Sequence, residues 1–194
     1  MRSTTSPINT IKNLLYGNFF GNKATRYGNE NESKALLEFE KKFNLKVNES
    51  GFHIDQQYPF LGASPDGLIG DQALIEIKCP LSIKEHTPTD GIISKKISFA
   101  ELINGELHLK RNHNYYFQIQ GQLAITDRQF GYFLIWSPHG ILVEKITRDD
   151  LFWKETMLPK LKIFYNNCLL PELLDPLHPK GIPIRDKVVT PSFI

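Results

Sequence analysis

The sequence predicts an α/β fold with a mixed central β-sheet flanked by helices, and two observations lead to this class. Apolar residues recur at helical spacing in residues 30–43, and the polar-apolar pattern of residues 114–126 fits a second helix. Short runs rich in β-branched and aromatic residues lie between these two helices and again after the second. Helices that alternate with strands are typical of domains in which the helices cover a sheet.

Length and composition indicate a folded protein of ordinary size. The chain has 194 residues, of which 41% are hydrophobic, enough for one domain with a proper core. Lys and Arg number 23 and Asp and Glu number 21, which excludes a generally basic surface but not a local positive groove. Cys79 and Cys168 are too few for a disulfide scaffold or a cysteine-rich zinc site, which indicates a reducing compartment.

Nothing in the sequence resembles a signal peptide, and no apolar run approaches membrane-spanning length. We therefore expect a soluble, intracellular protein without a membrane partner. The sequence does not distinguish nucleus from cytoplasm.

The first half of the chain contains two expected helices. Residues 7–16 form a short one, with Pro7 at its start and Gly17 after its end. The next helix should begin after Asn29 as the N-cap, with Glu32 three residues later as in a capping box. The residues that this second helix should bury are Leu36, Phe39 and Phe43.

Short strands follow, and the expected ranges are 51–55, 60–64, 67–70 and 73–78. After the helix at 114–126, strands at 130–137 and 141–146 are joined by a Pro-His-Gly turn. The last long helix should begin near Asp149, and Pro159 should kink or split it.

We expect one domain over residues 1–170 and a proline-rich tail over residues 171–194. The tail contains Pro171, Pro176, Pro179, Pro183 and Pro191. Because proline cannot continue a helix or a sheet ladder, the tail should be extended and either surface-bound or loose.

One expected strand carries charges where strand interiors normally avoid them. Glu76 and Lys78 stand two residues apart within the apolar run of residues 73–78. If residues 66–69 pair with residues 73–76 as a hairpin, Asp66 lies directly opposite Glu76. Opposed residues lie on one face with their Cβ atoms roughly 4.5–5.5 Å apart, and alternation brings Lys78 to the same face.

Two carboxylates at this distance repel one another unless a cation lies between them. A hard divalent ion with oxygen ligands, such as Mg²⁺, is the natural candidate, with Mn²⁺ as a plausible substitute. Taken alone, the Pro-Asp-Gly sequence around Asp66 is also typical of an ordinary turn, and Glu76 with Lys78 is also typical of a solvated strand face. The joint spacing favours a functional site.

These residues, in the motif SPDG…EIKCP, resemble the active-site signature of the PD-(D/E)xK nuclease superfamily. Within it, the chain is similar to the YqaJ-like viral recombinase family, to which phage lambda exonuclease belongs. The segments NENESKALLEFE and NYYFQIQGQLAIT resemble two further motifs of that family, in the family's order. The resemblance implies a restriction-endonuclease-like core and a metal-dependent deoxyribonuclease.

The resemblance also implies roles for individual residues. Asp66, Glu76 and the backbone carbonyl of Ile77 would bind the metal ion, and Lys78 would orient or deprotonate the attacking water and stabilise charge on the phosphate. The additional active-site glutamate falls on Glu30, which would support a second metal ion. The active-site glutamine falls on Gln118. For Glu30, simple compensation of the helix dipole is the alternative.

Several basic or polar residues are candidate DNA contacts, because contacts to phosphate need only charge and reach. They are Arg26, Lys95, Lys96, Lys110, Arg111 and Gln122. Gln122 lies one helical turn after Gln118, and a solvated stripe is its alternative interpretation. Arg26 is the candidate for sensing a 5′ phosphate at a DNA end.

The implied function is a 5′→3′ exonuclease that acts on linear ends of double-stranded DNA. The family resemblance also implies a homo-oligomer, a ring-shaped trimer. An endonuclease or nickase on the same core, and a catalytically silent DNA-binding module, remain the alternatives.

Overall fold

The computed structural model describes residues 6–18 and 20–186. Over these residues the chain forms two compact units. The larger unit is Gly21–Asp150, and the smaller joins the described residues before Gly21 to those after Asp150. The expected boundary at residue 170 lies inside the smaller unit.

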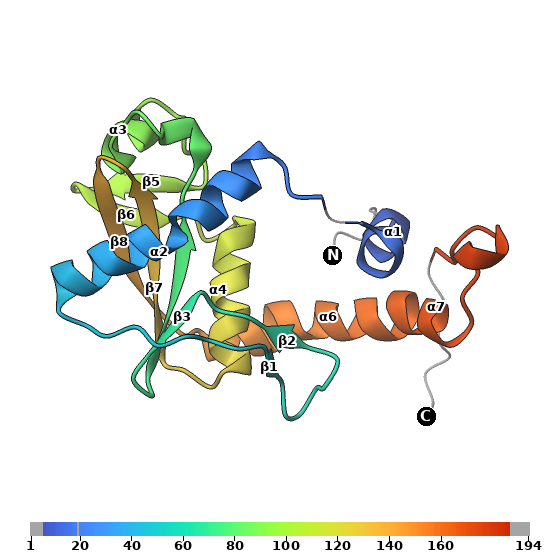
Figure 1. The fold of residues 1–194 in the computed structure, drawn as a ribbon. Helices are drawn as coiled ribbons and strands as arrows, with labels where there is room; N and C mark the ends of the chain where they lie inside the picture. The colour runs from blue at the N-terminus through green and yellow to red at the C-terminus, as the bar shows by residue number, and fades with distance from the viewer. Residues whose placement is uncertain (1–5, 19, 187–194) are drawn as a thin grey trace. The chain divides into compact units, whose positions relative to one another are not determined.

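The larger unit is built on a four-stranded sheet (Figure 1). Its strands, in spatial order, are β3 (Gly67–Ile69), β4 (Ala73–Lys78), β7 (Phe130–Ser137) and β8 (Gly140–Thr147). β4 runs parallel to β7, whereas the other neighbours are antiparallel. The prediction of a mixed sheet is therefore confirmed, and the four strands lie where the sequence indicated.

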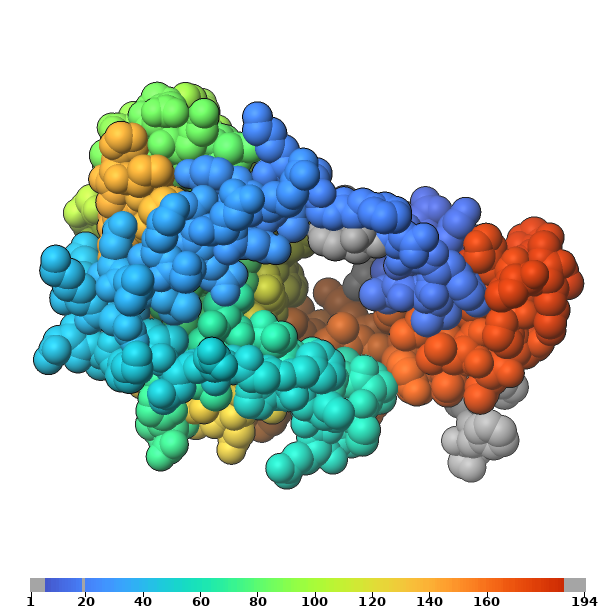
Figure 2. Space-filling view, in the orientation of Figure 1, coloured from blue at the N-terminus to red at the C-terminus, as the bar shows by residue number. Residues whose placement is uncertain are grey.

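Helix α2 (Lys23–Phe43) covers one face of this sheet. Its Ala35 and Phe39 are fully buried and pack against a cluster that includes Ile75, Ile77 and Leu134. Ile75 and Ile77 alternate with the charged residues of β4, because successive side chains of a strand point to opposite faces. In Figure 2 the outer side of α2 (light blue) lies uncovered on this face of the unit.

Helix α4 (Asn114–Ile125) covers the opposite face. Gly131 lies beneath it, and a Cβ atom there would approach Ile119 Cδ1 to 2.8 Å and Leu74 Cδ1 to 3.0 Å. A glycine at this position therefore lets the helix approach the sheet closely. Because both faces of β4 are covered, the side chain of Glu76 is only 1% exposed.

Smaller elements complete the unit. A two-stranded ribbon precedes the sheet, β1 (His53–Ile54) with β2 (Gly62–Ala63). Four elements between β4 and α4 were not predicted: a 3₁₀ turn (Leu81–Ile83), α3 (Pro88–Ile93) and the hairpin of β5 (Ala100–Ile103) and β6 (Glu106–Leu109). Leu107 and Leu109 of this hairpin are buried.

The smaller unit contains α1 (Ile8–Tyr16) and a continuous helical run. The run consists of α5 (Asp150–Phe152), a π-helical turn (Trp153–Met157), α6 (Leu158–Phe164), a second π-helical turn (Tyr165–Leu169) and α7 (Leu170–Leu174). Each π-turn ends two residues before a proline, Pro159 or Pro171. A proline lacks the N–H for the α-helical bond and clashes with the carbonyl four residues earlier, so widened turns accommodate it. Pro159 thus interrupts the α-helix, as expected.

The prediction of an extended tail is wrong for residues 171–174 and 178–180, which are helical. Pro171 lies in the first turn of α7, where proline is tolerated, and the chain then forms a 3₁₀ turn at His178–Lys180. Ile184 is buried in a cluster with Ile11 and Cys168. Residues 187–194 of the predicted tail lie outside the described residues.

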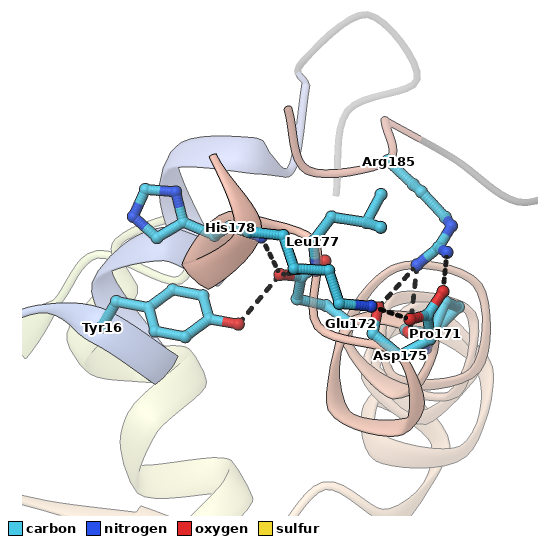
Figure 3. Close-up of polar contacts among 8 residues, drawn as sticks. Tyr16, Pro171, Glu172, Asp175, Leu177, His178 and Arg185 are labelled. Atoms are coloured by element: carbon cyan, nitrogen blue, oxygen red, sulfur yellow. Dashed lines mark hydrogen bonds and ion pairs between the residues drawn. The ribbon is translucent and has the colours of Figure 1, made fainter. Parts of the chain in front are cut away.

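A buried carboxylate ties this segment together (Figure 3). Glu172, 1% exposed, accepts hydrogen bonds at Oε1 from the Tyr16 hydroxyl (2.9 Å) and from the main-chain nitrogens of Leu177 (3.0 Å) and His178 (2.9 Å). Arg185 donates to the carbonyls of Pro171 and Asp175.

No helix within the described ranges is long and apolar enough to cross a lipid bilayer.

Candidate active site

The hairpin of β3 and β4 has the register that the sequence predicted. Gly67 pairs with Ile75 and Leu68 with Leu74, so the chain places Asp66 just before β3 and beside the end of β4. Asp66 is held there by two hydrogen bonds. Its main-chain nitrogen donates to the Ile75 carbonyl (3.2 Å), and its Oδ2 accepts from the main-chain nitrogen of Ile77 (2.6 Å).

Glu76 is a buried carboxylate with three side-chain donors. Lys78 Nζ and Gln118 Nε2 donate to its Oε1, the latter at 2.7 Å. Gln122 Nε2 donates to its Oε2 at 2.6 Å. Since a buried polar group is tolerated only when it is paired or hydrogen-bonded, these donors explain how the Glu76 side chain can occupy the interior of β4.

Lys78 lies between the carboxylates and an aromatic ring. Its Nζ contacts Glu76 and lies 4.5 Å from the centroid of the Tyr115 ring. Burial alone would lower the pKa of Lys78, but the charges of Glu76 and Asp66 outweigh it and raise the pKa. Lys78 is therefore an ammonium ion in the metal-free protein, which suits it to neutralise charge on a phosphate.

The carboxyl group of Asp66 has a strongly raised pKa. Burial is the largest cause and the charge of Glu76 the second, and together they raise its pKa to about 7, against the opposing bond from the Ile77 nitrogen. Burial and the neighbouring carboxylate thus both disfavour the ionised form of Asp66. A bound cation would favour that form.

Helix α2 contributes the carboxylate of Glu32 to the pocket, whereas the family resemblance had implied Glu30. The helix begins at Lys23, with Asn22 as its N-cap accepting from the Thr25 nitrogen (2.9 Å), so the predicted N-cap at Asn29 is wrong. Asn29 is an interior helical residue and Glu30 is exposed. Glu32 lies near Asp66 and Glu76, and burial followed by repulsion from Glu76 raises its pKa, while Lys78 opposes this.

The helical register explains the difference. Residues at i, i+3, i+4 and i+7 share one helix face, and the α2 residues that face the pocket in this pattern are Thr25, Gly28, Asn29 and Glu32. At about 100° per residue, Glu30 points roughly 200° away from Glu32. The structure therefore places Glu32, and not Glu30, with the other carboxylates.

Helix α4 presents its glutamines as follows. Gln118 faces the pocket, as the sequence indicated. Gln122 is 4% exposed and bonded to Glu76, so burial prevents the DNA contact that was predicted for it. Gln120 faces elsewhere, as expected, and bonds the Tyr116 hydroxyl and the Thr147 carbonyl.

These groups line one open pocket of about 620 Å³. Its charged and amide lining consists of Glu32, Asp66, Glu76, Lys78, Gln118, Asn29 and the N-cap Asn22. Phe99 and Tyr115 form an aromatic wall whose rings meet edge-to-face at 5.0 Å. Neither ring was singled out as a site residue in the sequence, although Tyr115 precedes Gln118 by one helical turn.

The candidate DNA-binding cations do not line this pocket. Arg26, Lys95 and Lys96 are exposed, and Lys95 borders a second, mainly apolar groove of about 420 Å³ together with Lys110. Lys110 Nζ donates to the Ser98 carbonyl (2.6 Å). Arg111 pairs with Glu144 (3.3 Å) and stacks on the Tyr116 ring (4.6 Å).

The donor set of the pocket fits a hard divalent cation. The available ligands are carboxylate oxygens and the Ile77 carbonyl, with amides nearby, and Mg²⁺ binds such sites through one or two carboxylates plus water. In the described part of the chain, no three His, Cys, Asp or Glu side chains are close enough to form a metal site by themselves. The protein groups would therefore have to share the ion with water or substrate oxygens.

Comparisons with known proteins identify exonucleases that are similar to this chain. The chain resembles an alkaline exonuclease (LHK-Exo) from Laribacter hongkongensis at 29% identity and a TM-score of 0.61, over 80% of this chain and 76% of that one. The structure of LHK-Exo in complex with dAMP matches at 27% identity and the same TM-score, with the same coverage. A phage-related exonuclease from Haemophilus somnus 129PT shares the fold, at 19% identity and a TM-score of 0.53 over 73% of this chain and 70% of that one.

No curated protein matches the chain by sequence. The solved structures confirm the expected PD-(D/E)xK nuclease core. The family model described as the YqaJ-like viral recombinase domain matches residues 4–129, more than half of the chain. The chain therefore belongs to the YqaJ-like viral recombinase domain family.

Proposed function

We propose that this protein is a metal-dependent exonuclease that degrades linear double-stranded DNA in the 5′→3′ direction. The observation that carries the proposal is the convergence of Asp66, Glu76, Lys78 and Glu32 in one open pocket. Family membership and the likeness to an alkaline exonuclease support the exonuclease activity.

The carboxylates would hold the metal ion. Asp66 and Glu76, with the Ile77 carbonyl, are the proposed ligands, and Glu32 takes the supporting role that the sequence assigned to Glu30. Mg²⁺ is the proposed ion, with Mn²⁺ as a substitute. When bound, such an ion activates a water molecule and neutralises charge on the phosphate.

The chain's own groups would position the reactants. Lys78, an ammonium ion in this environment, would stabilise the negative charge that develops on the scissile phosphate. Gln118 would orient the attacking water or a phosphate oxygen, since it faces the pocket. Phe99 and Tyr115 offer flat surfaces for a base or sugar next to that phosphate.

The size of the pocket is consistent with a single nucleotide. LHK-Exo was solved with dAMP, a nucleotide of the kind that an exonuclease releases. A pocket of about 620 Å³ is large enough for such a product. Contacts to the rest of the duplex are proposed for Arg26, Lys95, Lys96, Lys110 and Arg111.

A direct test compares linear with covalently closed duplex DNA in Mg²⁺, with chelator as the control. We expect linear DNA to be shortened from its ends to mononucleotides while closed DNA resists. Nicking of the closed DNA at the same rate would identify an endonuclease, and binding without cleavage would identify a silent DNA-binding module. Duplexes labelled at one 5′ or one 3′ end determine the polarity.

We also propose that the protein acts as a ring-shaped trimer, which family membership supports. A ring of identical subunits needs two different complementary surfaces on each subunit. Light scattering coupled to size-exclusion chromatography tests this directly. A monomer at working concentration would contradict the ring.

A further inference from the structure

Gln122 has an unusual position for a polar residue. It lies on α4 one turn beyond Gln118 and is 4% exposed. Its Nε2 lies 2.6 Å from Oε2 of Glu76. Burying an amide costs free energy unless its polar atoms are hydrogen-bonded, so the burial of Gln122 needs an explanation.

The amide is oriented by Glu76 alone. Within the described residues, Oε1 of Gln122 is buried and has no hydrogen-bond partner. A reversed amide would place that oxygen against the carboxylate, where both groups accept and neither donates. The side chain therefore contributes one polar interaction, the donation from Nε2 to Glu76.

The three donors divide unequally between the two oxygens of Glu76. Lys78 and Gln118 both donate to Oε1, whereas Gln122 is the side-chain donor to Oε2. Lys78 and Gln118 line the pocket, whereas Gln122 does not. Gln122 therefore holds Oε2 of Glu76 from the buried side, while Oε1 lies with the two donors that line the pocket.

We infer that Gln122 is a positioning residue that fixes the orientation of the Glu76 carboxylate and thereby its ability to bind the metal ion. This inference rests on the proposed function and deepens it. A neutral donor suits the role, because it holds the oxygen without cancelling the charge that attracts the cation. Loss of an outer partner of this kind commonly lowers metal affinity by about 10–100-fold.

The test compares wild type with Gln122→Met, which has a similar volume but no donor. Mn²⁺ binding to the DNA-free protein is measured by titration calorimetry, and activity is measured against both Mn²⁺ and DNA concentration. We expect Gln122→Met to bind Mn²⁺ roughly 10–100-fold more weakly. High Mn²⁺ should restore much of kcat, with KM for DNA and the salt dependence unchanged.

Gln120→Met is the matched control. Gln120 is equally buried on the same helix, but it bonds Tyr116 and Thr147 and not the carboxylates. This variant should lose thermal stability while binding Mn²⁺ as the wild type does. A general loosening of α4 would instead weaken Mn²⁺ binding in both variants and overturn the inference.

Gln122→Lys provides a second test of the inference if Gln122→Met does not fold. An ammonium group can still pair with Glu76, but it cancels the negative charge, so Mn²⁺ binding should fall. A DNA-contact role predicts the opposite result, namely tighter DNA binding and a steeper salt dependence with unchanged Mn²⁺ affinity.

Unchanged Mn²⁺ binding in Gln122→Met, beside a wild type that binds Mn²⁺ and degrades DNA, would overturn this inference alone. A wild type that neither binds Mn²⁺ nor degrades DNA would overturn the proposed function itself.

Discussion

The main-chain nitrogen of Ile77 donates a 2.6 Å hydrogen bond to Oδ2 of Asp66. This bond joins the turn residue that precedes β3 to the strand that carries Glu76 and Lys78. Ile77 itself lines the pocket together with the two carboxylates. The geometry of the pocket is therefore set by the main chain as well as by side chains.

Asp66→Asn, Glu76→Gln and Lys78→Ala should each reduce DNA degradation by more than ~10²-fold, because each removes a ligand or a charge at the reacting phosphate. Folding should persist, as near-ultraviolet circular dichroism can verify. Asp71→Asn, in the exposed turn of the same hairpin, is the control and should keep wild-type turnover. Near-normal activity of any of the three in Mg²⁺ would show that the site is assigned wrongly.

Glu32→Gln should lower kcat by at least ~10-fold, and Glu30→Gln should leave it within about twofold, since only Glu32 faces the pocket. The two substitutions are chemically identical and lie on one helix. Steady-state kinetics at saturating DNA separates them. Equal losses, or a larger loss at Glu30, would mean that α2 adopts another register on its substrate.

The stability of the metal-free protein should depend on the ionisation of Asp66. Its pKa is raised to about 7, so its protonated form is favoured in the folded state. The resulting stability is fully present below the unfolded-state pKa near 4 and is lost as the pH rises through about 7. Melting curves in chelator should show Tm falling by up to about 3–5 °C per pH unit over this window.

Asp66→Asn is the control for that experiment. An uncharged amide cannot ionise, so the variant should lose most of this pH dependence and be more stable than wild type above pH ~7. A parallel pH profile in the two proteins would assign the effect to another group.

Removing the metal should not unfold the protein. The sheet is held by apolar packing on both faces, including Phe39 on one side and Ile119 on the other, both fully buried. Mg²⁺ should therefore raise Tm modestly, by mass action on the folded state. Unfolding in chelator at room temperature would contradict this and would indicate a structural metal.

Glu172→Gln should loosen the segment after α7. Burial opposes ionisation of Glu172, but hydrogen bonds from the His178 nitrogen, the Tyr16 hydroxyl and the Leu177 nitrogen outweigh it and lower its pKa. Its stabilising effect is present above the unfolded-state pKa and is lost as the pH falls through the lower folded-state value. Amide hydrogen exchange at Leu177 and His178 should quicken in the variant, whereas exchange in β4 should not change.

Much of the fold and the centre of the site could be predicted from the sequence. The register of β3 and β4 could be predicted from the spacing of Asp66, Glu76 and the turn between them, because a short turn fixes how two consecutive strands pair. Glu32 was missed because Asn29 and Glu32 have the spacing of a capping box, although the helix had already begun at Lys23. Only the pairing of Asn22 with Thr25 shows where the helix begins.

Gln122 could not be placed correctly from its own helix. Its helical spacing indicated the same side as Gln118, but its burial depends on how closely α4 packs on the sheet. That packing depends in turn on Gly131, which lies on the following strand, β7, and not on α4 itself. The order of the tail was missed for a similar reason. Its prolines argued against regular structure, whereas a single carboxylate, Glu172, accepts the bonds that order the segment.

The parallel pairing of β4 with β7 has a consequence for the order of events during synthesis. β3 and β4 can join as soon as they emerge, but Glu76 pairs opposite Phe133, and its amide donors lie on α4, which is also made later. Long-range pairing of this kind is slow, because the intervening chain must first be brought together. A nascent chain that ends before α4 therefore carries Asp66 and Glu76 without the amide donors and the strand that hold Glu76 in place.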